Sequence, residues 1–160
     1  ATNSAKVTIS GFGPAQTEIK LEVNGKKYTQ KASLDGKFRF ENIALSEGEN
    51  RVVAVSIKDN NESNPSNKLT ITYDSKAPDL EIISPENGSR FFDLEKKTEV
   101  RGTVSADAKV YVNDHFVITD SDGNFSYTVT LSDGENKIKI KAEDKAGNKT
   151  EKELTLTYTP

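Results

Sequence analysis

The feature that most constrains the fold of this chain is an internal repeat. The segment Asp35-Gly-Lys-Phe-Arg-Phe40 is matched by Asp122-Gly-Asn-Phe-Ser-Tyr127, and Ser46-Glu-Gly-Glu-Asn50 is matched by Ser132-Asp-Gly-Glu-Asn136. The copies keep the same order, and each would occupy about 75–85 residues, near the lower end of independently folding sizes. The repeat therefore predicts two similar domains in tandem.

Both copies show the hydrophobic period of β-strands. Apolar side chains alternate with polar ones on both sides of the turn Ser132-Asp-Gly-Glu135, as expected for strands with one buried face. They are Phe125, Tyr127, Val129 and Leu131 before the turn, and Ile138, Ile140 and Ala142 after it. Short alternating runs separated by turns continue along the whole chain. This pattern predicts an all-β fold of two seven-stranded β-sandwiches.

The first copy departs from simple alternation at one point. Its apolar phase slips by one residue between Phe40 and Ile43, which predicts a β-bulge near Glu41 or Asn42. The strand after the next turn is expected to carry its apolar side chains on one face, and these are Val53, Val55 and Ile57.

The boundary between the domains is predicted in the segment Asp74-Ser-Lys-Ala-Pro78, because proline ends strand pairing. The expected domains are residues 1–74 and 75–160. The second begins with a strand at Leu80 and Ile82, whereas only six residues precede the equivalent strand of the first at Val7. Six residues span at most about 20 Å. The first domain is therefore expected to lack its opening strand, either because preceding residues complete it in a longer array or because another molecule donates a strand.

Composition argues against several functional classes. The 160 residues include no cysteine and carry a net charge of −3, so disulfides and thiol catalysis are excluded. Neither half has the clustered basic surface that nucleic-acid binding requires. No apolar run approaches the ~18 residues needed to cross a bilayer. We expect no nucleic-acid partner and no membrane insertion of this segment.

Residues with catalytic potential lie beside predicted turns. His115, the only histidine, follows the turn Asn113-Asp114, where a hairpin rim offers no cleft for a nucleophile and an orienting carboxylate. Acidic pairs also flank turns, at Glu47 with Glu49 and at Asp133 with Glu135. Exposed hairpin ends do not desolvate carboxylates as general acid–base chemistry requires. We predict that the chain is not an enzyme and has no catalytic residue.

Two further motifs have ordinary structural interpretations. Gly11-x-Gly13 is not followed by a helix that could bind a pyrophosphate, so it indicates a strand end and no cofactor site. Lys137, Lys139 and Lys141 alternate along one strand, which places them together on a solvated face. Neither motif predicts a cofactor-binding residue.

A group of acidic residues in predicted loops is the last candidate for a binding site. Loops at one end of the second domain would hold Asp107, Asp120, Asp122, Glu143 and Asp144, and the facing end of the first would hold Glu47, Glu49 and Asp74. The spacing Asp120-x-Asp122-x-Asn124 is similar to part of a calcium loop, but the bidentate glutamate of such loops is missing. A bridging calcium ion competes with the simpler interpretation of solvated turn residues. We assign no metal ligand from the sequence.

Six short motifs, in this order, resemble the bacterial immunoglobulin-like repeats of cell-surface and secreted proteins, above all the family named after domain B of glucodextranase. They are Pro78-Asp-Leu-Glu-Ile-Ile-Ser-Pro-Glu-Asn-Gly88, Val100-Arg-Gly-Thr-Val104, Lys109-Val-Tyr-Val-Asn113, Asp122-Gly-Asn-Phe125, Gly134-Glu-Asn-Lys-Ile138 and Asp144-Lys-Ala-Gly-Asn148. The first copy departs from the pattern, with Asp59-Asn-Asn-Glu-Ser63 in place of the last motif. The resemblance implies two tandem Ig-like sandwiches forming an extracellular, non-catalytic module.

Two roles for such a module stay open at this stage. The first is a spacer or stalk that holds a neighbouring domain of the same parent protein away from the cell envelope. The second is an accessory module that binds a cell-wall glycan or a protein partner. Binding would need an exposed aromatic or apolar patch, and the candidates in the sequence are Phe91-Phe92 and Tyr111.

Overall fold

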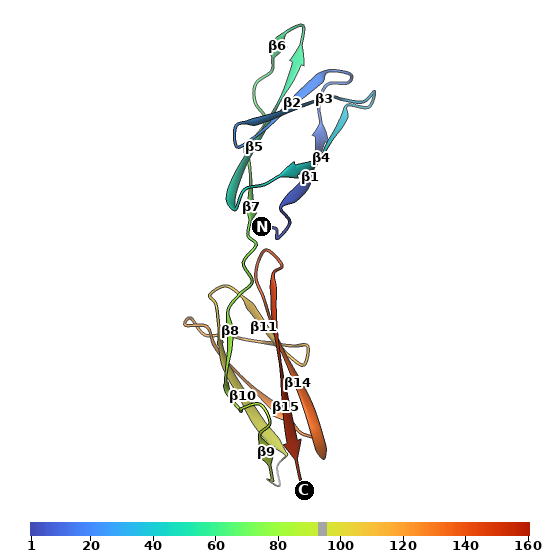
Figure 1. Ribbon diagram of the computed structural model, residues 1–160. Coiled ribbons are helices and arrows are strands. Elements are labelled where there is room, and N and C mark those ends of the chain that lie inside the picture. The colour runs from blue at the N-terminus through green and yellow to red at the C-terminus, as the bar shows by residue number, and fades with distance from the viewer. Residues whose placement is uncertain (93–95) are drawn as a thin grey trace. The chain divides into compact units, whose positions relative to one another are not determined.

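A computed structural model describes residues 1–92 and 96–160, and these residues form strands and turns with no helix (Figure 1). None of them, accordingly, forms a helix able to cross a membrane. The chain divides into two compact units, unit 1 at Ala1–Ser75 and unit 2 at Lys76–Pro160. The division falls one residue after the boundary expected from the sequence.

Unit 1 is a sandwich of two antiparallel sheets. Strand β1 pairs with β4 in one sheet, and the other has the order β3-β2-β5, with β6 and β7 both paired to β5. The strands are β1 (Lys6–Phe12), β2 (Glu18–Val23), β3 (Lys26–Lys31), β4 (Lys37–Ala44), β5 (Gly48–Lys58), β6 (Asn61–Glu62) and β7 (Leu69–Tyr73).

Unit 2 repeats this arrangement with additional strands. One sheet has the order β13-β10-β8 and the other the order β12-β11-β14-β15-β9, in which β9 joins β15 in parallel. The strands are β8 (Leu80–Ser84), β9 (Arg90–Phe91), β10 (Lys97–Val104), β11 (Lys109–Val112), β12 (His115–Val117), β13 (Asn124–Thr130), β14 (Gly134–Glu143) and β15 (Lys149–Tyr158). The two units confirm the expected all-β class of tandem Ig-like sandwiches.

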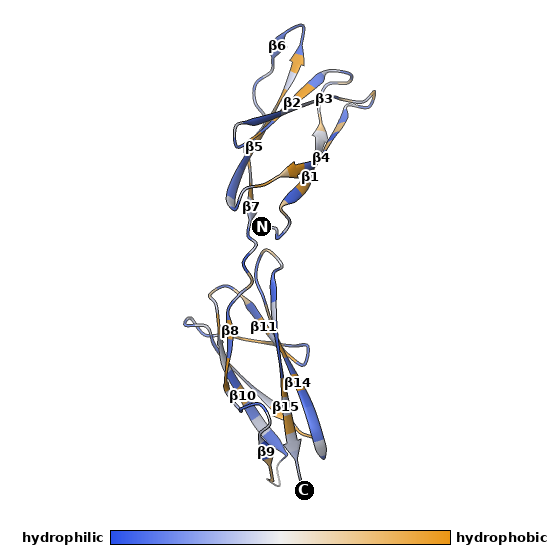
Figure 2. Ribbon diagram, viewed as in Figure 1, coloured by the Kyte–Doolittle hydropathy of each residue, from blue (hydrophilic) through white to orange (hydrophobic). Residues whose placement is uncertain are grey.

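Each unit has its own hydrophobic core between its sheets, built from the alternating side chains that the sequence indicates. Figure 2 shows the resulting mixture of hydrophobic and hydrophilic residues along the strands. The core of unit 2 contains Leu80, Val100, Val104, Ala108, Val110, Val112, Val117, Phe125, Val129, Leu131, Ile138, Ile140, Ala142, Leu154, Leu156 and Tyr158. That of unit 1 contains Ile19, Leu21, Val23, Ala32, Phe40, Ile43, Leu45 and Val52.

The bulge predicted in the first copy is confirmed. Val7 pairs with Ile43 and Ile9 with Phe40, so β4 has one residue more than β1 between these pairs. Asn42 has a φ of 56°, a left-handed conformation that asparagine tolerates better than most residues. The extra residue restores the inward direction of Ile43 and Leu45.

The predicted apolar face of β5 is wrong. Val52 is buried in the core, whereas Val53, Val55 and Ile57 are half-buried and lie outside the core cluster. The cause is Asn50, a polar residue that is 0% exposed and sets the inward phase of the strand. Because side chains alternate in direction, an inward Asn50 also turns Val52 inward and Val53 outward.

Unit 1 lacks the counterpart of β8, as the sequence predicts. Strand β10 pairs with β13 on one side and β8 on the other, whereas within residues 1–75, all of which are described, β1 pairs only with β4. The counterpart of β9 is retained as a single residue. Thr2 forms a parallel bridge to Tyr73, in the same relation as Phe91 to Tyr158 in unit 2. Residues 1–75 therefore keep the contact equivalent to β9 without a strand equivalent to β8.

Candidate functional site

The repeated motif Ser-x-Gly-Glu-Asn folds into a braced hairpin turn in both units. The side chain of Asn50 accepts a hydrogen bond from the Ser46 backbone amide at 2.8 Å and donates to the carbonyls of Ser46 and Gly48 at 2.8 and 3.0 Å. Asn136 makes the same three bonds to Ser132 and Gly134. The motif is thus a structural element of both hairpins, and Glu47, Glu49 and Glu135 belong to it.

The residues with calcium-like spacing, Asp120, Asp122 and Asn124, form a turn in which the carboxylate of Asp120 is hydrogen-bonded within the turn itself. The carboxylate of Asp120 accepts hydrogen bonds from the backbone amides of Asp122 and Asn124 at 2.9 and 2.8 Å, and from the Asn124 side chain at 2.9 Å. Asp144 accepts the same set of bonds from Ala146 and Asn148, at 2.8 to 2.9 Å. Both turns have the sequence Asp-x-x-Gly-Asn. The sequence pattern alone suggests a calcium-like spacing for the first turn and a family motif for the second, and does not show that they form the same structure.

These hydrogen bonds shift the titration of both carboxyl groups. The side-chain amide of Asn124, assisted by the backbone amides of the turn, lowers the pKa of Asp120 below its ordinary value. Burial raises the pKa of Asp144, but the hydrogen bonds from Asn148 and the backbone outweigh it and leave that pKa lowered. Both carboxylates are therefore stabilised in their charged form by amide donors.

Three of the remaining acidic residues of the predicted junction have partners within their own unit. Asp107 pairs with Lys145 at 3.0 Å and Glu143 with Lys149 at 3.8 Å within unit 2. In unit 1, Glu47 accepts hydrogen bonds from the backbone and hydroxyl of Ser75. Across the described residues, no group of three or more His, Cys, Asp or Glu side chains is arranged to hold a metal ion.

His115 lies at the start of β12 on an exposed turn. Its Nδ1 is 2.9 Å from the carbonyl oxygen of Asn113, and its ring stacks on Tyr127 with centroids 5.9 Å apart. The acidic residue Asp133 is engaged by Lys96, whose Nζ lies 2.6 Å away. The structure thus places His115, Glu47 and Asp133 in three separate local contacts.

The binding candidates separate into buried and exposed aromatic rings. Phe91 packs against the core of unit 2, whereas Phe92 is exposed. Tyr111 lies on β11 beside Phe116, with ring centroids 5.8 Å apart, and the Nζ of Lys141 is 4.6 Å from the Tyr111 ring centroid. Phe116, which the sequence did not indicate, is 58% exposed. We call Tyr111, Phe116 and Lys141 the β11 aromatic patch.

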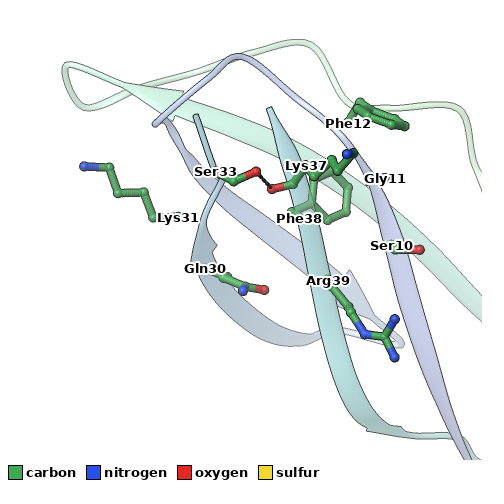
Figure 3. A pocket seen from close by; sticks show the side chains of 9 residues that line it. All are labelled: Ser10, Gly11, Phe12, Gln30, Lys31, Ser33, Lys37, Phe38 and Arg39. Atoms are coloured by element: carbon green, nitrogen blue, oxygen red, sulfur yellow. Dashed lines mark hydrogen bonds between the residues drawn. The ribbon is translucent and has the colours of Figure 1, made fainter. Parts of the chain in front are cut away.

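A second surface feature lies beside β1, β3 and β4 of unit 1. It is a depression of about 650 Å³, the β1 depression, lined by Ser10, Gly11, Phe12, Gln30, Lys31, Ser33, Lys37, Phe38 and Arg39 (Figure 3). The ring of Phe38 covers Gly11, where a Cβ would lie 2.5 Å from the ring. This contact explains Gly11 as a packing requirement. The sequence indicated the unpaired strand β1 but not this depression.

The architecture and the repeated turn braces define the chain as a tandem pair of immunoglobulin-like β-sandwich modules. The chain belongs to the family described as glucodextranase, domain B, whose model matches residues 78–159. Among solved structures, the fibronectin(III)-like modules of Clostridium thermocellum CbhA match with a TM-score of 0.61 and 13% identity, covering 99% of this chain and 88% of that one. At this identity the likeness shows the fold alone.

Sequence relatives are much longer than this chain. It is 36% identical over 160 residues to Bacillopeptidase F of Bacillus subtilis (strain 168), covering 97% of this chain and 11% of that protein. It is 39% identical over 87 residues to a PII-type proteinase of Lactococcus lactis subsp. cremoris, covering 52% of this chain and 4% of that protein. In both cases the similarity concerns a small part of a large protein.

Proposed function

We propose that this chain is a non-catalytic spacer of two domains, residues 1–74 and 75–160, within a larger bacterial protein that acts outside the cell. One observation carries the proposal. The whole repeat is similar to a segment that makes up only 11% of a peptidase, so the chain corresponds to an accessory part of that protein. In such a part, two similar sandwiches in series supply length without contributing to the chemistry.

The local structure supports this role. The polar residues that most resemble catalytic or metal-binding groups serve as turn braces, as Asp120, Asp144 and Asn50 do. A braced turn satisfies backbone groups that would otherwise fray at the end of a hairpin. The asparagine brace occurs in both copies, as Asn50 and Asn136, which is expected of a repeated structural module.

The spacer function is tested by replacement. In the longer protein that contains it, residues 1–160 would be exchanged for an unrelated pair of Ig-like sandwiches of equal length. A spacer predicts unchanged hydrolysis of a small soluble peptide and unchanged cleavage of a cell-bound protein substrate. Deletion of the pair, by contrast, should impair only the second activity. Loss of cell-bound cleavage on exchange as well as on deletion would contradict the proposal.

The β11 aromatic patch favours a second candidate function, the binding of a glycan or protein partner. An exposed aromatic ring with a cation above it is a common element of recognition surfaces. The positions equivalent to Tyr111 and Phe116 in unit 1 are Glu22 and Lys27, so the patch belongs to unit 2 alone. Binding of unit 2, but not unit 1, to a glycan array, with loss in Tyr111→Ala, would replace the spacer function by this one.

A further inference from the structure

Two Asn-Gly pairs occur in the chain, at Asn24-Gly25 and Asn87-Gly88. An asparagine in such a pair is prone to deamidation, because glycine has no side chain to hinder attack by its own amide nitrogen on the asparagine side chain. Both pairs lie in exposed turns. The side chains of the two asparagines make different hydrogen bonds, however, and those of Asn24 connect it to the interior of unit 1.

Asn24 is bonded to the buried asparagine brace of unit 1. Its Nδ2 donates to the Oδ1 of Asn50 at 2.8 Å, and its Oδ1 accepts from the backbone amide of Arg51 at 2.8 Å. Asn24 and Gly25 have φ values of 49° and 83°, as in a two-residue type I′ turn between β2 and β3. The first residue of this exposed turn is therefore held by a side chain that is 0% exposed.

The direction of the bond between the two asparagines is fixed by the other partners of Asn50. Its Oδ1 also accepts from the amide of Ser46, and its Nδ2 donates to the carbonyls of Ser46, Gly48 and Ile71 at 2.8 to 3.2 Å. Reversing the Asn50 amide group would place its Nδ2 against a donor and its Oδ1 against carbonyl oxygens. Asn24 must therefore supply a hydrogen-bond donor, which an amide provides and a carboxylate does not.

The reaction available to this pair requires only the chain and water. The Gly25 nitrogen attacks Cγ of Asn24 and gives up its proton, and the new N–Cγ bond closes a five-membered succinimide. The bond from Cγ to Nδ2 breaks, and Nδ2 leaves as ammonia with the proton that the Gly25 nitrogen released. Water then opens the succinimide at one of its two carbonyl groups, which leaves aspartate or isoaspartate at position 24.

The folded turn prevents this reaction. Ring closure requires the Cγ of Asn24 to swing towards the Gly25 nitrogen, which breaks the bonds of its side chain to Asn50 and Arg51 together. It also requires the Cβ of Asn24 and the Gly25 nitrogen to lie on the same side of the bond between Cα and the carbonyl carbon, away from the type I′ conformation. The attack therefore takes place when the turn opens, and its rate follows the open fraction of unit 1.

We propose that the Asn24-Gly25 turn is a masked modification site, at which opening of unit 1 leads to irreversible deamidation of Asn24 and the product prevents the brace from reforming. Aspartate at position 24 places a carboxylate oxygen against the Oδ1 of buried Asn50, with no hydrogen between the two acceptors. Isoaspartate adds a methylene to the main chain of a two-residue hairpin, whose register depends on the length of its loop. Unit 1 therefore opens more readily once it has been modified.

Unit 2 contains two natural controls. The side chain of Asn87 accepts a hydrogen bond from the Thr155 amide at 2.7 Å, and a carboxylate accepts such a bond equally well. Conversion of Asn87 to aspartate should therefore be tolerated. The turn equivalent to Asn24-Gly25 is Asn113-Asp114, with φ values of 46° and 64°. In that turn an aspartate side chain stands beside the attacking nitrogen in place of a glycine hydrogen.

The masking is tested by incubating residues 1–160 at mildly alkaline pH, with and without urea, and measuring the products at position 24 by peptide mass spectrometry. We expect deamidation of Asn24 to be slower in the folded chain than in urea by about tenfold or more. In the folded chain, Asn50→Ala should accelerate it about tenfold or more, because the brace no longer holds the turn. Asn136→Ala, the same change in unit 2, should leave the rate at position 24 unchanged.

The consequence is tested with variants that imitate the product or slow the chemistry. Asn24→Asp should lower the urea midpoint of unit 1, followed through the NMR amide signals of β2 and β5, whereas Asn87→Asp should leave the midpoint of unit 2 unchanged. Gly25→Asp copies the Asn-Asp turn of unit 2 and should slow deamidation at position 24 even in urea. If Asn50→Ala fails to fold, the rates of the unaltered chain with and without urea still measure the masking.

Three outcomes would overturn the proposal. The first is an equal rate of deamidation at position 24 with and without urea, because the folded turn would then not mask the site. The second is an unchanged rate in folded Asn50→Ala, which would show that the brace does not control the turn. The third is an unfolding midpoint of Asn24→Asp equal to that of the unaltered chain, because the modified turn would then still support the brace.

Discussion

Phe38 and Phe125 occupy the same position in the two units, but only Phe125 is fully buried. Each pairs with a glycine of the neighbouring strand, Gly11 or Gly102. The rings lie over these glycines, where a Cβ would come within 2.5 or 2.6 Å of the ring. Because β8 covers the sheet in unit 2 only, one sequence motif has two degrees of burial.

This pair gives a direct test of the cover that β8 provides. Phe125→Ala is expected to destabilise unit 2 by about 3–5 kcal/mol, the usual cost of removing a buried phenylalanine ring. Phe38→Ala should cost unit 1 roughly half as much, since part of its ring already contacts water. Urea unfolding of each unit separately would measure both values. Equal losses would show that β8 does not control the burial of this position.

The two asparagine braces differ in a similar way. Asn50 adds to the shared bonds a hydrogen bond to the carbonyl of Ile71 at 3.2 Å and accepts one from the Asn24 side chain at 2.8 Å. Asn50→Ala leaves several buried polar groups without partners and is expected to cost about 2–4 kcal/mol, against about 1 kcal/mol for the less buried Asn136→Ala. Thermal unfolding of the separate units gives the comparison. A larger loss for Asn136→Ala would contradict the assignment of Asn50 as the principal brace.

Much of the fold could be predicted because both copies obey the same local rules. Alternation of apolar residues gives strand faces directly, and turns such as Asn24-Gly25, with φ values of 49° and 83°, depend on residues close in sequence. The bulge at Asn42 was also visible, since it shifts the apolar phase of a single strand.

The errors concern features that depend on distant partners. The face of β5 was misassigned because Asn50, a polar residue, is buried by hydrogen bonds to several separate segments, which hydropathy does not register. The turn role of Asp120 was not separated from a calcium loop, because sequence spacing does not show which amides a carboxylate will meet. The β1 depression is lined by residues of β1, β3 and β4, which are separated in the sequence. Local sequence patterns contain none of this information.

The corrected phase of β5 leads to a prediction for adjacent valines. Val52→Ala removes buried methyl groups from the core of unit 1 and is expected to cost about 1.5–3 kcal/mol. Val53→Ala, on the outer face, should cost less than about 1 kcal/mol. Denaturant unfolding of both variants decides which residue faces inward. If Val53→Ala destabilised unit 1 more than Val52→Ala, the inward face predicted from hydropathy would be correct.

Substitutions at Gly123 and Gly134 distinguish the cost of backbone strain from the cost of a steric clash. Gly123 and Gly134 have φ values of 82° and 87°, but a Cβ at Gly123 would lie 2.2 Å from the Val104 carbonyl oxygen, whereas nothing lies within 4 Å of one at Gly134. Both alanine variants carry the cost of a left-handed backbone. Gly123→Ala should be less stable than Gly134→Ala by a further 1–3 kcal/mol or so, because the neighbouring strand must move. Similar unfolding midpoints would mean that the β13 turn adapts without cost.

The Asp-x-x-Gly-Asn turns predict how unit 2 responds to acid. The pKa of Asp120 is lowered in the folded chain by the side chain and backbone of Asn124, so below about pH 4 the unfolded chain binds more protons than the folded one. The stabilisation is complete above the ordinary pKa of aspartate and is lost as the pH falls towards the lowered value. Asp120→Asn should therefore weaken the fall in melting temperature between about pH 4 and pH 2. Asp122→Asn, which removes a charge from the same turn and leaves the three hydrogen bonds of Asp120 intact, should preserve that fall. An equal weakening in both variants would assign the acid response to net charge, and an unchanged profile in Asp120→Asn would exclude the turn as its source.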